Sequence, residues 1–389
     1  MEYRQFGRLD WKVSALGFGC MRFPTTNGNE NIDEAESARM LRYAIDRGVN
    51  YVDTAYPYHG GNSEPFLGRV LEQDGYRERV RLATKMPSWK IEERGDFDRY
   101  LDEQLESLRT DQIDFYLLHA LREAWWHKLR DLGVLDWAEG AQAEGRIGHL
   151  GFSFHDQYPI FKEIVDAYDW TLCQIQYNYM DIENQAGTRG LQYAASKGLA
   201  VVVMEPILGG RLVDPPEPIQ EIWSRAPRPR KPADWALQWL WHQPEVSVVL
   251  SGMSEMSHVE ENVASANAAV GGAASGTLTE EELAIFDQVR EAYRALCPIP
   301  CTQCQYCMPC PHGVDIPENF EVYNQGVMYD KPDHARRSYG FIDEEKRANA
   351  CIACLECEDQ CPQSIPISEW MVHVHEVLGE GAPYVCSLP

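Results

Sequence analysis

The sequence predicts an α/β protein: a (β/α)8 TIM barrel followed by a small, mostly α-helical second domain. Eight short apolar segments alternate with longer helical patterns over roughly the first 270 residues. Several of these segments, such as DFYLLH and LAVVVM, are almost continuously apolar, as strands buried on both faces are. Eight of the twelve cysteines then fall in two tight runs near the C-terminal end.

The barrel prediction rests on the number and order of these segments. The predicted strands are 13–19, 50–53, 80–85, 113–119, 147–153, 172–176, 200–205 and 246–251. Helical patterns lie between them, for example at 33–47, 96–109, 158–168 and 233–242. Eight strands alternating with helices over about 250 residues is typical of a (β/α)8 barrel. A doubly wound open sheet is the rival fold, but the turn LGFGCMRFP lacks the third glycine of its G-x-G-x-x-G fingerprint.

The cysteine runs predict two iron–sulfur clusters. The first run is Cys301, Cys304, Cys307 and Cys310, and the second is Cys351, Cys354, Cys357 and Cys361. The second has the C-x2-C-x2-C-x3-C-P spacing in which the fourth cysteine binds the other [4Fe–4S] cluster. By this rule one cluster takes Cys301, Cys304, Cys307 and Cys361, and the other takes Cys310, Cys351, Cys354 and Cys357. The first run departs from the pattern, with two residues rather than three before Cys310.

Zinc and disulfides are the alternatives for these cysteines. Structural zinc sites normally combine two C-x2-C pairs rather than four consecutive ligands. Disulfides need an oxidising compartment and are typical of short secreted chains. Proline and cysteine become frequent from Cys297 onward, so we expect a barrel domain at 1–296 and a ferredoxin-like domain at 297–389. Helical patterns at 319–329 and 333–350 make that second domain mostly helical.

Composition limits the classes of partner. The 389 residues carry a formal net charge of −25 and show no basic stripe, which argues against a nucleic-acid partner. No segment has the apolar length of a membrane span, and the opening MEYRQFGRLD is too polar for a signal peptide. We therefore expect no membrane partner and a location in the reducing cytoplasm. The oligomeric state stays open.

Polar side chains stand at successive strand ends. Asp53 ends the second predicted strand, Lys85 the third and His119 the fourth, while Tyr58 follows Asp53 in DTAYPYHGG. In (β/α)8 barrels the carboxyl ends of the strands build the active site. Each residue alone has a structural explanation: Tyr58 packing in a loop, or Lys85 pairing with some carboxylate. The consistent register of all four favours a catalytic site.

These residues resemble the catalytic tetrad of the aldo-keto reductase family. The contexts DTAYPY, TKMP and DFYLLHAL carry the resemblance, together with GFG, GFS, QIQYN and SGMSEMSHVEEN. The resemblance covers roughly residues 1–295, and the cysteine-rich tail resembles the extension of a ferredoxin-containing branch of that family. It implies an NAD(P)-dependent oxidoreductase that reduces a carbonyl compound or oxidises an alcohol.

The resemblance assigns a role to each member of the tetrad. Tyr58 is the general acid, but an unperturbed phenol has a pKa near 10 and is a weak acid at neutral pH. We expect the Lys85 ammonium to lower the pKa of Tyr58 and Asp53 to hold Lys85 in place. His119 would orient the carbonyl oxygen. Trp89, Trp125 and Trp126 follow Lys85 and His119 and would line the substrate pocket, or else simply pack in the loops.

The resemblance also implies the nicotinamide contacts. Ser153 and Gln174 would meet the carboxamide, Gly209 and Gly210 the pyrophosphate, and Glu261 and Asn262 the adenine. The full set is Gly19, Cys20, Met21, Ser153, Gln174, Glu205, Pro206, Leu208, Gly209, Gly210, Ser251, Gly252, Met253, Ser254, His258, Glu261 and Asn262. Ser254 and His258 stand where an arginine commonly grips a 2′-phosphate, so the choice between NADH and NADPH stays open.

The two kinds of cofactor handle electrons differently. A hydride carries two electrons together, whereas a [4Fe–4S] cluster passes one at a time, and no flavin motif is visible. The clusters serve structure, or exchange electrons with the barrel site, or the chain is chiefly an electron-transfer protein. We favour the reductase, with electron transfer through the clusters as an addition. The alternative is an iron–sulfur protein whose barrel serves a non-nicotinamide redox reaction, with a redox partner protein.

Overall fold

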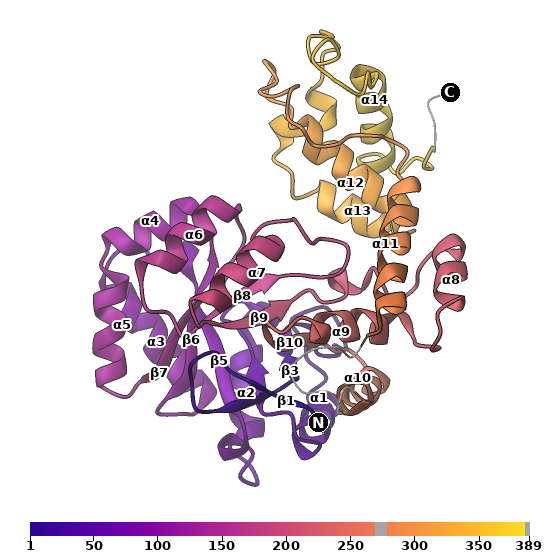
Figure 1. Cartoon of the computed structure of the whole chain (residues 1–389). Coiled ribbons are helices and arrows are strands. Elements are labelled where there is room, and N and C mark those ends of the chain that lie inside the picture. Colours follow the sequence, from indigo (N-terminus) through magenta and orange to yellow (C-terminus); the bar gives the residue numbers. More distant parts are fainter. Residues whose placement is uncertain (269–277, 386–389) are drawn as a thin grey trace. The chain divides into compact units, whose positions relative to one another are not determined.

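The computed structural model describes residues 1–268 and 278–385 and contains the predicted barrel (Figure 1). Eight parallel strands close in the order β10-β3-β4-β5-β6-β7-β8-β9. Chain order is preserved around the ring, and helices cover its outside. This is the (β/α)8 fold, and it brings the carboxyl ends of all eight strands to one mouth. Among the described residues no helix is long and apolar enough to cross a membrane.

The elements of the barrel have these bounds. The strands are β3 Leu16–Gly19, β4 Tyr51–Asp53, β5 Arg81–Met86, β6 Ile113–Leu121, β7 Ile147–Phe154, β8 Leu172–Gln176, β9 Ala200–Met204 and β10 Val246–Gly252. The helices are α1 Glu34–Asp46, α2 Ser63–Leu71, α3 Gly95–Leu108, α4 Glu123–Asp131, α5 Val134–Ala143, α6 Tyr158–Ala167, α7 Gly187–Ser196, α9 Pro232–His242 and α10 Met256–Ala268.

The first predicted strand, 13–19, divides into two strands. Its start belongs to β2 (Lys12–Ser14), which pairs antiparallel with β1 (Tyr3–Gln5) outside the barrel. Its end is β3, which pairs with β4 and β10 inside the barrel. Both pieces are apolar enough to look like one buried strand in the sequence. The direction of the chain changes at Ala15, and hydrophobic pattern alone carries no signal for that change.

An aromatic plug closes the amino-terminal end of the barrel. The rings of Phe6, Tyr51 and Phe115 lie with their centroids 4.8 to 5.8 Å apart, and all three side chains are buried. The residue after Phe6 is Gly7, which lies against the start of β9. A Cβ on Gly7 would lie 2.5 Å from the backbone nitrogen of Ala200. The filled end leaves the opposite mouth as the place for a site.

Contacts divide the described chain into two compact units. The first is Met1–Gly209 with Ala233–Thr279, and the second is Gly210–Pro232 with Glu280–Pro389. The sequence-based boundary at 296/297 differs from this grouping, because α8 (Glu217–Ser224) and α11 (Glu280–Ala295) pack with the cysteine-rich part. Trp223 meets Phe286 edge to face at 5.1 Å, and Arg228 pairs with the buried Glu282.

The second unit has its own hydrophobic core. Its remaining helices are α12 Ile316–Met328, α13 Pro332–Tyr339 and α14 Ile367–Leu378. Phe320, Tyr323 and Trp370 are buried in this core, and six of the cluster cysteines pack against it. The pattern at 333–350 predicted one long helix, but α13 stops at Tyr339 and two short 3-10 turns follow. The predominantly helical character is as expected.

Two glycines on the barrel helices give a matched test of packing. A Cβ on Gly68 in α2 would lie 2.4 Å from the carbonyl oxygen of Ser107, whereas a Cβ on Gly140 in α5 meets no atom within 4 Å. We expect Gly68→Ala to destabilise the fold by about 1–3 kcal/mol through overpacking. Gly140→Ala should stabilise it by about 0.5–1 kcal/mol through helix propensity. Thermal unfolding of both variants under anaerobic conditions checks this, and equal shifts would contradict it.

Candidate active site and cysteine sites

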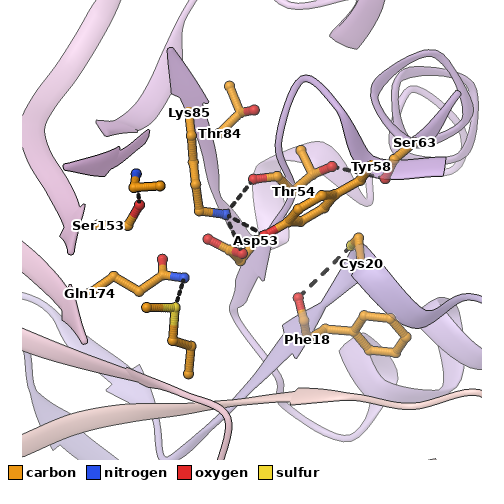
Figure 2. Close-up of polar contacts among 12 residues, drawn as sticks. Phe18, Cys20, Asp53, Thr54, Tyr58, Ser63, Thr84, Lys85, Ser153 and Gln174 are labelled. Carbon is orange, nitrogen blue, oxygen red and sulfur yellow. Dashed lines mark hydrogen bonds and ion pairs between the residues drawn. The ribbon is translucent and has the colours of Figure 1, made fainter. Parts of the chain in front are cut away.

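Three strand ends bring the predicted tetrad together. Asp53 ends β4, Lys85 lies in β5, and His119 lies in β6, the next strand of the ring. The Lys85 ammonium donates to Asp53 Oδ1 at 2.7 Å, to the Thr54 carbonyl oxygen at 2.7 Å and to Tyr58 Oη at 3.3 Å (Figure 2). Lys85 is fully buried and Asp53 almost so. The Thr54 carbonyl was not anticipated, since a main-chain acceptor leaves no mark on the sequence.

A tight turn presents Tyr58 to the lysine. Tyr58 opens the 3-10 turn Tyr58–Gly61, in which His59, Gly60 and Gly61 all have positive φ. His59 can adopt this unusual conformation because it is buried and its Nδ1 lies 2.7 Å from the carbonyl oxygen of Asn29. The turn reverses the chain into α2 and leaves the phenol hydroxyl facing Lys85, as Figure 2 shows.

The electrostatics differ from the expectation for Tyr58. Burial raises the pKa of Tyr58, the Lys85 ammonium lowers it in part, and the balance lies above the ordinary value. We expected a lowered pKa from the lysine alone, because the cost of desolvating a phenolate is not visible in a sequence. Burial lowers the pKa of Lys85, but the charges of Asp53 and Tyr58 raise it by more, so the lysine stays protonated. Tyr58 is therefore a neutral phenol at neutral pH, in contact with a cation.

His119 is an uncharged imidazole beside this pair. Burial lowers the pKa of His119 well below its usual value, and the Lys85 charge lowers it further. Its ring centroid lies 6.2 Å from that of Tyr58, and its Nδ1 is buried with no hydrogen-bond partner among the described residues. A neutral imidazole keeps one N–H donor, which is what a carbonyl oxygen needs.

Two of the three predicted pocket tryptophans lie beside His119. The Trp89 ring is 5.1 Å from the His119 ring, and Trp125 is 6.0 Å from Trp89. Trp126 corrects the prediction: it is fully buried, and its Nε1 donates to Glu163 Oε1 at 2.9 Å. Consecutive residues of an α-helix project about 100° apart, so Trp126 is buried in the core while Trp125 contacts Trp89.

Most of the predicted nicotinamide residues lie in or just after β3, β7, β8, β9 and β10, and the last three lie in α10. Ser153 Oγ accepts a hydrogen bond from the Ala120 amide at 2.7 Å, and Gln174 donates to Met204 Sδ at 3.6 Å (Figure 2). Gln174 Oε1 is buried without a partner among the described residues, which suits a ligand amide. Asn262 donates its side-chain amide to Ser251 Oγ at 3.0 Å, and its contact with the adenine stays a prediction.

The turn after β9 is open enough for a phosphate-bearing ligand. Glu205, Leu208, Gly209 and Gly210 all have positive φ, and an added Cβ on either glycine would meet no atom within 4 Å. Met21 is half exposed, whereas Cys20 is buried with its pKa raised by burial and then by Asp53. Ser254 and His258 are exposed at the start of α10. The two open glycines permit a pyrophosphate to approach the backbone closely.

The eight cluster cysteines line two separate cavities, four to each. Cys301, Cys304, Cys307 and Cys361 line one, and Cys310, Cys351, Cys354 and Cys357 line the other. These are the two sets that the spacing predicts, including the exchange of the last cysteine of each run. Ile316 at the start of α12 lines both cavities. Cys310 takes the expected place despite its shorter spacing.

The chemistry of the two cysteine sets suits an iron–sulfur cluster better than a single ion. Burial raises the pKa of Cys307 to about 11, and the neighbouring Cys301, Cys304 and Cys361 raise it as well. Cys357 in the other set has its pKa raised to about 11 for the same reasons. Within the described residues no three His, Cys, Asp or Glu side chains converge closely enough for one bare metal ion. Four thiols lining one cavity give the number of ligands that a [4Fe–4S] cluster takes.

Comparison with known families and proteins agrees with this geometry. The model of the aldo/keto reductase family matches residues 15–291, and the model of the 4Fe-4S dicluster domain matches residues 300–365. An L-galactose dehydrogenase from Arabidopsis thaliana is 29% identical over 294 residues, covering 68% of this chain and 88% of its own. A 6-dehydroglucose reductase from Novosphingobium aromaticivorans is 30% identical over 227 residues, covering 55% and 71%.

A solved structure extends the likeness to three dimensions. The holo form of an aldo-keto reductase from Bacillus halodurans superposes with a TM-score of 0.61 at 26% identity, covering 74% of this chain and 96% of its own. The matched family model spans more than half of the chain and includes the four strand-end residues. With its barrel, its tetrad and its two cysteine sets, the chain belongs to the aldo/keto reductase family and carries a C-terminal 4Fe-4S dicluster domain.

Proposed function

We propose that the protein is an NAD(P)H-linked carbonyl reductase in which Tyr58 is the general acid. The observation that carries this proposal is the buried Lys85 ammonium, which contacts both Asp53 and the Tyr58 hydroxyl. The substrate is a small carbonyl compound, or the corresponding alcohol in the reverse direction. The neutral state of Tyr58 supports reduction, since reduction needs a proton on the tyrosine and oxidation needs the phenolate.

The residues divide the work as follows. A bound nicotinamide supplies a hydride to the carbonyl carbon. Tyr58 gives its hydroxyl proton to the carbonyl oxygen, and the ammonium of Lys85 stabilises the phenolate that forms. Asp53 keeps Lys85 charged and oriented at 2.7 Å. His119 donates its N–H to the same carbonyl oxygen and so fixes the face that is presented.

The neighbouring Tyr56 offers a matched control for Tyr58. Tyr58→Phe should lower kcat/KM for carbonyl reduction by about 10²–10⁴-fold, because the proton donor is lost while the ring stays. Tyr56 lies on the same loop and donates to Glu103 at 3.2 Å, so Tyr56→Phe should leave kcat/KM within about threefold. Steady-state kinetics and nucleotide titration by fluorescence check this. Undiminished turnover in Tyr58→Phe would remove Tyr58 from its assigned role.

We further propose that the second unit binds two [4Fe–4S] clusters, one in each four-cysteine cavity. Anaerobically prepared protein should then contain about eight iron atoms per chain. Cys361→Ser and Cys304→Ser should lose the same cluster, although the two cysteines belong to different runs. Cys297 lines neither cavity, and Cys297→Ser should keep the full iron content. Iron and sulfide assays with electron paramagnetic resonance spectra distinguish these variants, and loss of different clusters would disprove the exchange.

Electron transfer through the clusters is a second proposal, supported by the exposure of the cysteine loops. Tyr306 is 68% exposed, Ile352 63% and Leu355 50%, and each lies between cluster cysteines. Exposed loops offer no advantage to clusters that only stabilise the fold. They would let a redox partner protein come close to the clusters. We propose the reducing cytoplasm as the location, because exposed thiolates and iron–sulfur clusters survive there.

Anaerobic mixing tests whether the clusters and the barrel site exchange electrons. Each cluster accepts one electron, so two clusters have the capacity to take the pair carried by one hydride. On mixing with NADH or NADPH, the cluster absorbance should bleach at a rate at least equal to kcat. Cys361→Ser, with one cluster lost, should show about half the amplitude. Unchanged absorbance over many turnovers would leave the clusters with a structural role.

A further inference from the structure

A second buried carboxylate lies close behind the tetrad. Glu64 belongs to α2, is only 3% exposed, and is followed in the helix by the mostly apolar segment PFLGRVL. Its Oε1 accepts the Thr84 hydroxyl at 2.5 Å and the Gln104 side-chain amide at 2.6 Å. Burying a carboxylate is costly unless its hydrogen bonds are made. The bonds from Thr84 and Gln104 offset this cost and fix the position of the Glu64 carboxylate.

Gln104 connects this carboxylate to the main chain of the catalytic lysine. From α3, its Nε2 also lies within hydrogen-bond distance of the Lys85 carbonyl oxygen, at 3.1 Å. Tyr116 donates to Gln104 Oε1 at 2.7 Å, which fixes the orientation of the amide so that its NH₂ faces Glu64 and Lys85. Side chains from α2, α3 and β6 therefore converge on the Thr84–Lys85 segment of β5.

We infer that Glu64 is a positioning residue: through Thr84 and Gln104 it holds the main chain of Lys85 and thereby keeps the ammonium in contact with Tyr58. The inference rests on the proposed role of Tyr58. The Lys85–Tyr58 contact is 3.3 Å, close to the outer limit for a hydrogen bond, so a shift of a few tenths of an ångström would weaken it. The two shorter bonds of Lys85, to Asp53 and Thr54, tolerate such a shift better.

The surroundings of Glu64 agree with this role. Burial raises its pKa to about 7, while the bonds from Thr84 and Gln104 and the charge of Lys85 oppose the rise. Glu103 on α3 raises it slightly further. Either protonation state leaves Oε1 able to accept both bonds, so what matters is an acceptor oxygen at this position.

Asp114 offers a control on the same strand. Its buried carboxylate accepts the Leu82 amide at 2.9 Å and pairs with Arg77 and Arg81, so it holds the opposite end of β5. If Glu64 only stabilised β5, its loss and the loss of Asp114 at the other end of the strand should change the Tyr58 pKa to the same extent. If Glu64 positions Lys85, only a substitution of Glu64 should change the Tyr58 pKa.

The experiment compares Glu64→Ala, Glu64→Gln and Asp114→Asn in the full-length, cluster-loaded protein. The first readout is the Tyr58 pKa, from a titration of ¹³C-tyrosine ring signals assigned with Tyr58→Phe. Glu64→Ala should raise this pKa by about one unit, because the lysine charge no longer opposes burial, and should lower kcat about tenfold with KM little changed. Glu64→Gln, which keeps an acceptor oxygen, should stay within about threefold of the wild-type kcat. Asp114→Asn should lower the unfolding midpoint and leave the Tyr58 pKa unchanged.

Two outcomes would overturn the inference: wild-type values in Glu64→Ala, or an equal shift of the Tyr58 pKa in Asp114→Asn. If Glu64→Ala does not fold, Thr84→Val removes one of the two bonds and should move the Tyr58 pKa in the same direction. Absence of carbonyl reduction by the wild type would refute the proposed function instead. The titration of Tyr58 still decides the positioning role in that case.

Discussion

The active-site mouth depends on one buried cation. A lysine ammonium removed from water is tolerated only where opposite charge and lone pairs surround it. Here Asp53, the Thr54 carbonyl and the Tyr58 hydroxyl provide them. The barrel makes this feasible because its parallel strands end at one edge, so Asp53 and Lys85 meet at neighbouring strand ends and the turn after β4 adds Tyr58. Burial keeps Tyr58 protonated although the Lys85 charge lowers its pKa, and burial together with that charge keeps His119 neutral.

In the second unit, cysteine thiols rather than hydrogen-bonding groups line the two candidate sites. Its helices α12 and α14 supply a buried core, and the cysteine loops lie against that core with little regular structure of their own. Ile316 lines both cysteine cavities, so one side chain serves as a wall for each. Tyr306, Ile352 and Leu355 in these loops stay exposed and take no part in that core.

Much of the site could be predicted because its signals are local. Asp53, Lys85 and His119 each end a recognisable apolar segment, and the cysteine spacing contains the ligand exchange directly. What could not be predicted depends on neighbours brought together by folding. The raised pKa of Tyr58 comes from desolvation, and the internal bond of Asn262 from its position opposite Ser251. Glu64 shows only a weak signal, a charged residue within an apolar helical segment, and its partners come from other elements.

The grouping of 210–232 and α11 with the cysteine-rich unit constrains how such a chain could have been assembled. Lys331 pairs with Asp214, and Arg211 lies over the Tyr329 ring, so a stretch inserted between β9 and β10 shares its packing with the C-terminal helices. A chain cut after α10 would separate Trp223 from Phe286, although the two rings pack together in the second unit. The cysteine-rich C-terminal segment therefore shares one folding unit with residues 210–232 and α11. Acquiring or discarding it in evolution would require matched changes in an internal loop of the reductase half.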